Sequence, residues 1–100
     1  MNEFTTIENR ILQDLEIDLV PLNDIVREFS GFKKLPTEED FLKTLEFLKF
    51  FLNNNRIRCL EGSDMKEVNI SNNLLIEKLK KKWYDGLYSH IDYSIWFYKI

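Results

Sequence analysis

Residues 37–62 read TEEDFLKTLEFLKFFLNNNRIRCLEG, a capped helix that runs through three asparagines into a short alternating segment. Thr37 and Asp40 have the spacing of a capping box, in which each side chain accepts a hydrogen bond from the backbone N–H of the other residue. The pattern predicts a helix to about Leu52 and a strand over residues 56–60. A helix that leads directly into a strand also resembles the reading helix and wing of small DNA-binding domains.

Further elements are predicted on both sides of this stretch. Apolar periodicity predicts helices over residues 4–16, from residue 21 or 22 to Phe29 with Gly31 as its C-terminal cap, and from Ser71 or Asn72 to the Asp85–Gly86 pair. A bend with a two- or three-residue strand is expected near residues 17–20, a returning strand over residues 67–70, and a last strand over residues 94–100. The chain is therefore predicted to form a single domain over residues 1–100. We expect a small α+β, winged-helix-like fold with about four helices and a small antiparallel sheet, made by a hairpin near residues 56–70 and the C-terminal strand.

Composition narrows the classes of function. The 100 residues carry a net charge of −3 and an isoelectric point near 5.2, whereas DNA-binding domains usually have a basic excess that contacts phosphates. No apolar run is long enough to span a bilayer, and the N-terminus lacks the pattern of a signal peptide. Cys59 is the only cysteine, so no intramolecular disulfide can form and Cys59 is expected to be a small apolar strand residue. We expect a cytoplasmic protein with no membrane partner.

The two faces of the helix over residues 38–52 differ in chemistry. Its core face is predicted to carry Phe41, Leu45, Leu48 and Leu52, and its outer face Lys43, Glu46, Phe47, Phe50 and Asn54. Base edges and phosphates require hydrogen-bond donors, which two phenylalanines and a glutamate do not supply. One interpretation is that the last helix or the C-terminal strand covers Phe47 and Phe50. The other is that Glu46, Phe47 and Phe50 contact a protein partner.

Two other groups of residues are candidates for partner contacts. Glu61, Asp64 and Glu67 form an acidic cluster around the predicted hairpin turn, which either keeps the domain soluble or faces a basic protein. Trp96 and Tyr98 share one face of the last strand. If this strand is central, the pair belongs to a covered face, and if it lies at an edge, the pair is a contact site.

No catalytic motif stands out in the sequence. His90, Asp85 and Asp92 match no metal spacing, and no nucleophile is placed beside them. The three glycines are isolated, so no phosphate-binding loop is expected, and the four lysines within residues 78–82 are expected to form a solvated helix face. We therefore expect no enzyme, no catalytic or metal-binding residue, no cofactor and no small-molecule ligand. Nucleic acid is not expected as a partner.

Four segments together resemble a family of small bacterial immunity proteins. They are LVPLNDIVREF (19–29), NRIRCLEG (55–62), LKKKWYDG (79–86) and YSIWFYKI (93–100). The resemblance covers about residues 17–100 and depends on element order, on a Trp after the basic run and on a Trp–Phe pair in the last strand. Tyr84 departs from the family pattern, in which a Pro follows the first of these tryptophans.

The resemblance implies a function and a partner. Members of that family lie beside polymorphic toxins, including the Maf and contact-dependent inhibition systems, and act as their immunity proteins. The implied activity is stoichiometric binding of the toxic C-terminal domain, often a nuclease, in the cytoplasm of the producing cell. The alternative that remains open is a winged-helix transcription regulator that binds DNA.

Overall fold

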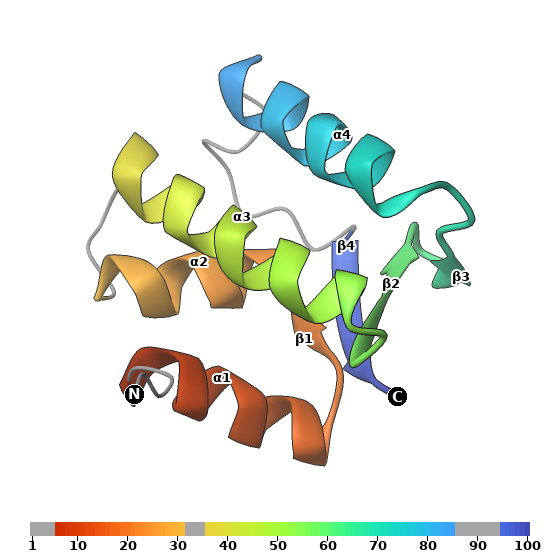
Figure 1. Ribbon diagram of the computed structural model, residues 1–100, viewed down its shortest axis with the longest axis horizontal. Coiled ribbons are helices and arrows are strands. Elements are labelled where there is room, and N and C mark those ends of the chain that lie inside the picture. The colour runs from red at the N-terminus through yellow and green to blue at the C-terminus, as the bar shows by residue number, and fades with distance from the viewer. Residues whose placement is uncertain (1–5, 32–35, 86–94) are drawn as a thin grey trace.

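The computed structural model describes residues 6–31, 36–85 and 95–100. Its elements follow in the order α1 (Thr6–Ile17), β1 (Val20–Pro21), α2 (Leu22–Ser30), α3 (Glu38–Asn53), β2 (Ile57–Glu61), β3 (Lys66–Glu67), α4 (Asn72–Tyr84) and β4 (Ile95–Lys99). The four helices stack beside the sheet, with α1 at one end of the stack and α4 at the other (Figure 1). The α+β prediction, with four helices and a small antiparallel sheet, is confirmed.

The local signals around α2 and α3 act as predicted. Thr37 caps α3: its hydroxyl accepts from the N–H of Asp40 at 3.2 Å, and the Asp40 carboxylate accepts from the N–H of Thr37 at 2.9 Å. Gly31 ends α2 in the left-handed region, with a φ of 70°. Asn55 takes a φ of 57° and turns the chain from α3 into β2, a conformation that asparagine tolerates better than most residues.

The sheet has the order β1-β4-β2-β3, with every neighbouring pair antiparallel. The C-terminal strand β4 is therefore central, paired with β1 through Val20 and Pro21 and with β2 along its whole length. The predicted returning strand over residues 67–70 is too long and begins too late. Only Lys66 and Glu67 pair with β2 as a strand, and Val68 adds one further hydrogen bond, to the carbonyl of Cys59.

The core lies between the sheet and the helices. Helix α3 contacts α2, α4 and β2, and α1 and α2 contact β4. The three largest fully buried side chains are Phe41 and Phe51 of α3 and Phe97 of β4. Cys59 is also buried, as the sequence predicts. Trp83 of α4 stacks on Phe41, with ring centroids 4.6 Å apart, and so joins α4 to α3.

The predicted outward position of Phe47 is wrong. Its side chain is only 2% exposed. Its ring packs edge-on against Phe29 of α2, with ring centroids 5.8 Å apart, and lies tilted against Phe51, with ring centroids 4.7 Å apart. The reason is that α3 is covered on two flanks, by α2 as well as by α4 and the sheet. Its buried arc is therefore wider than one apolar stripe. The interpretation that another element covers Phe47 is confirmed, and α2 takes part in this cover through Phe29, where the last helix or the C-terminal strand was expected.

The likeness to a winged helix remains a prediction. The elements follow the order that the sequence predicts, including a helix between the hairpin and the last strand, and β4 lies between β1 and β2 in the sheet. Within the described ranges, no helix has the length and apolar character needed to cross a membrane.

Candidate functional site

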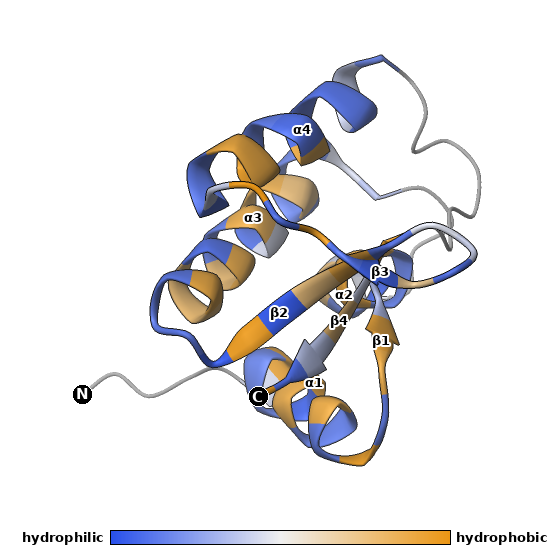
Figure 2. Cartoon of the chain, turned by 90° about the vertical axis from the view of Figure 1, so that its right-hand side faces the viewer, coloured by the Kyte–Doolittle hydropathy of each residue, from blue (hydrophilic) through white to orange (hydrophobic). Residues whose placement is uncertain are grey.

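One face of the sheet gathers aromatic, apolar and charged side chains. Strand register places Arg58 opposite Tyr98, and Leu60 opposite Trp96 on one side and Glu67 on the other. Cα partners in a sheet share a face. We call these five residues (Arg58, Leu60, Glu67, Trp96 and Tyr98) the outer sheet face. Figure 2 views the molecule from the side of the sheet, with α2 behind it and with the hydropathy of β2 changing along its length.

Strand alternation produces this face. The intervening residues on β2 and β4, namely Ile57, Cys59, Ile95 and Phe97, point to the opposite side and are buried. Successive strand residues point to opposite sides, so their neighbours Arg58, Leu60, Trp96 and Tyr98 must point away from the core. On the outer sheet face Leu60, Trp96 and Tyr98 are half-buried, and Arg58 and Glu67 are exposed. Strand β4 is thus central in the sheet, as one interpretation predicted, and still presents Trp96 and Tyr98 at the surface.

A hydrogen-bond network fixes the polar part of the outer sheet face. The Tyr98 hydroxyl donates to Oε1 of Glu67 at 2.6 Å, and the Arg58 guanidinium donates to Oε2 at 3.1 Å. The network spans three strands, from β4 across β2 to β3. The bond from Tyr98, and after it the bond and charge of Arg58, lower the pKa of Glu67 below its ordinary value. The same carboxylate raises the pKa of Tyr98, because a phenolate would lose the bond and meet a like charge.

The eight predicted contact residues do not form one site. Glu67, Trp96 and Tyr98 meet on the outer sheet face. Glu61 bonds the ammonium of Lys78 on α4 at 2.6 Å, and Asp64 pairs with Lys66 within the hairpin turn at 3.6 Å. The remaining three are on α3, where Glu46 and Phe50 are exposed and Phe47 is buried.

Sequence reasoning identified neither Leu60 nor Arg58 as a contact residue for a protein partner. The signal was present in IRCLE (57–61), where Arg58 and Leu60 alternate with two apolar residues. It could not be used, because the partner strand of β2 on this side is β4, which lies 34 or more residues further along the chain.

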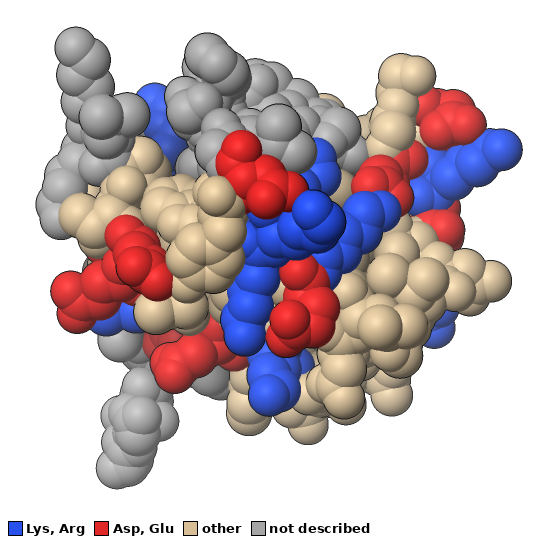
Figure 3. Space-filling model, turned by 90° about the horizontal axis from the view of Figure 1, so that it is seen from above, with Lys and Arg blue, Asp and Glu red and all other residues tan. Residues whose placement is uncertain are grey.

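The lysine run of α4 is paired within the chain. Besides the Lys78–Glu61 bond, Lys80 pairs with Glu77 at 3.5 Å and Lys81 with Asp85 at 2.8 Å. Figure 3 shows basic and acidic side chains side by side on the surface that α4 forms. These pairs offset much of the positive charge of the run and leave no broad basic patch there for phosphates. The loop with His90 and Asp92 lies outside the described residues, and within the described ranges no cluster of three or more His, Cys, Asp or Glu residues could hold a metal ion.

No protein-family model matches the chain, and no curated protein and no solved structure matches it. The outer sheet face is therefore identified by its geometry alone.

Proposed function

We propose that this protein is a protein-binding domain that acts through the outer sheet face, and specifically an immunity protein that neutralises the toxic domain of a cognate polymorphic toxin. The observation that carries the proposal is the partial exposure of Trp96, Tyr98 and Leu60 together on one face, beside the ordered Arg58–Glu67 pair. The immunity role, and with it a location in the cytoplasm, is proposed from the family resemblance of the sequence together with this geometry.

The composition of the outer sheet face suits a protein partner. Trp, Tyr and Arg are the residue types that most often carry binding energy at interfaces, and apolar centres with polar rims are their usual arrangement. Leu60 and Trp96 supply the apolar part, and Glu67 with its two donors supplies the polar part. Both edge strands, β1 and β3, contain only two residues, which gives an added strand little to pair with. We therefore propose binding through the face of the sheet and not through its edge.

The face is ordered before any partner arrives. Strand β4 is paired on both sides, and Tyr98 and Arg58 are held by Glu67. Ordering a side chain at an interface costs on the order of 1 kcal/mol, so side chains already held in place reduce the cost of association. The net charge of −3 favours a basic partner and its rate of encounter, as expected for a nuclease domain.

Stoichiometric occlusion would require only this surface. If a toxin bound the outer sheet face close to the toxin's own active site, the bulk of this protein would block that active site or the path of its substrate. No bond is made or broken in such a mechanism, and inhibition follows from the stability of the complex.

Co-expression tests the proposal. The toxic domain to be tested is that of an effector encoded next to the gene of this protein. It should arrest growth when it is produced alone, and growth should continue when this protein is produced with it. Purification should then yield a 1:1 complex. Arrested growth together with no complex would refute the immunity role. Salt-sensitive binding to the protein's own upstream DNA, lost in Arg58→Gln, would instead support the transcription regulator.

A further inference from the structure

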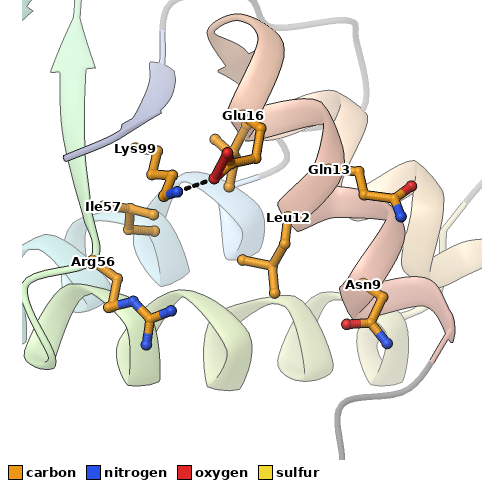
Figure 4. A pocket seen from close by; sticks show the side chains of 8 residues that line it. Asn9, Leu12, Gln13, Glu16, Arg56, Ile57 and Lys99 are labelled. Atoms are coloured by element: carbon orange, nitrogen blue, oxygen red, sulfur yellow. Dashed lines mark hydrogen bonds and ion pairs between the residues drawn. The ribbon is translucent and has the colours of Figure 1, made fainter.

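A hollow of about 230 Å³ lies between α1 and the ends of β2 and β4, away from the outer sheet face. Figure 4 shows Leu12 reaching into the space from α1, and Lys99 and Glu16 pointing toward one another above it. The lining comprises Asn9, Leu12, Gln13, Leu15, Glu16, Arg56, Ile57 and Lys99. These residues come from three separate parts of the sequence, so no local sequence motif predicts the hollow.

The base of the hollow is apolar and firmly placed. Leu15 is 4% exposed and Ile57 is 2% exposed, so both belong to the core, and the half-buried Leu12 lies beside them. An apolar surface of this kind favours a ligand with a hydrocarbon part. Inorganic anions such as phosphate would leave it uncovered.

The rim of the hollow has an excess of positive charge. Lys99 and Glu16 form an ion pair and offset one another. Arg56 has no such partner: among the described residues, no carboxylate lies within ion-pair distance of its guanidinium, which instead lies 5.9 Å from the centroid of the Phe51 ring. Its backbone is fixed by hydrogen bonds to the carbonyl of Phe51 at 2.9 Å and from the N–H of Ile100 at 3.1 Å.

We propose that this hollow binds a small organic monocarboxylate with a short apolar body. The Arg56 guanidinium would take the carboxylate as a charge-assisted pair, and the apolar body would lie on Leu12 and Ile57. A cationic ligand is disfavoured because Glu16, the only carboxylate among the described residues that line the hollow, is already paired with Lys99. The volume suits a ring or a branched chain and is below the roughly 300–1,000 Å³ of sites for larger ligands, so the expected affinity is weak.

Titration with phenylacetate, followed by two-dimensional amide NMR on the full chain, tests this site. The expected result is a set of saturable shifts at the amides of Asn9, Gln13, Ile57 and Lys99. The uncharged analogue phenylacetamide should bind about tenfold more weakly, because the charge-assisted pair is lost.

Two matched variants make the assignment specific. Arg56→Gln should weaken phenylacetate binding about tenfold, and Arg58→Gln, which removes the same charge from a residue that does not line the hollow, should leave it within twofold. Leu12→Trp should fill the hollow and abolish the shifts, with folding checked by thermal melting. Equal binding of phenylacetamide, shifts elsewhere in the chain, no saturable shifts, or unchanged affinity in Arg56→Gln would each overturn the proposal. None of these outcomes depends on the proposed protein partner.

Discussion

Phe47 and Phe50 lie three residues apart on α3, and the structure gives them opposite environments. The ring of Phe47 is 2% exposed and packed between Phe29 and Phe51, whereas that of Phe50 is 50% exposed. Replacing each by alanine removes the same atoms from the same helix. The pair therefore isolates the contribution of burial.

The expected costs differ severalfold. A fully buried Phe→Ala change removes about 3–5 kcal/mol from the free energy of unfolding, because it loses burial and leaves a cavity. For Phe50, half of the roughly 1.5–3 kcal/mol for burying such a side chain gives about 1 kcal/mol. At roughly 4–8 °C per kcal/mol for a domain of this size, Phe47→Ala should lower Tm by about 20 °C and Phe50→Ala by about 5 °C.

Urea unfolding followed by tryptophan fluorescence measures both free energies. Circular dichroism before unfolding should show unchanged helix content in each variant. Equal losses for the two variants, or a loss below about 1 kcal/mol for Phe47→Ala, would contradict the two-sided burial of α3.

Three further results are expected. Thr37→Ala should lower the free energy of unfolding by about 1 kcal/mol, because the N–H of Asp40 loses its acceptor, and a loss below about 0.3 kcal/mol in urea unfolding would refute this role. The Cys59 thiol, whose pKa is raised to about 12 chiefly by burial, should resist an aromatic disulfide reagent at pH 8 until urea unfolds the chain, and prompt reaction in the folded state would contradict its burial. Because Tyr98 lowers the pKa of Glu67, the stabilisation from the Glu67 carboxylate is present above its ordinary pKa of 4.5 and is lost as the pH falls through the lower folded value. Tyr98→Phe should raise this pKa toward 4.5 in an NMR titration, and an unchanged value would show that the hydrogen bond does not form in solution.

The sequence predicted the elements whose signals are local. A capping box at Thr37, a glycine at position 31 and a cap predicted at Ser71 or Asn72, which the structure has at Ser71, each fix a helix end through neighbouring residues. Such signals need no knowledge of the rest of the fold.

The candidate site could be predicted only in part, because it depends on pairings between distant strands. Trp96 and Tyr98 were identified from their chemistry, but their position at the surface of a central strand depends on β2 and β3. Leu60 can be assigned to the same face only from the register between β2 and β4. Phe47 was misplaced for a related reason, since its cover comes from α2 and a helical wheel carries no information about neighbours.

We propose that the outer sheet face binds the partner, and α3 supplies a matched control for this. Titration calorimetry of the cognate toxin domain against Trp96→Ala and Phe50→Ala compares an aromatic residue of that face with one elsewhere on the surface. Trp96→Ala should weaken binding by at least about 30-fold, as for an interface hot spot, whereas Phe50→Ala should change it less than about threefold. Full affinity in a folded Trp96→Ala variant, or a larger loss in Phe50→Ala, would contradict this proposal.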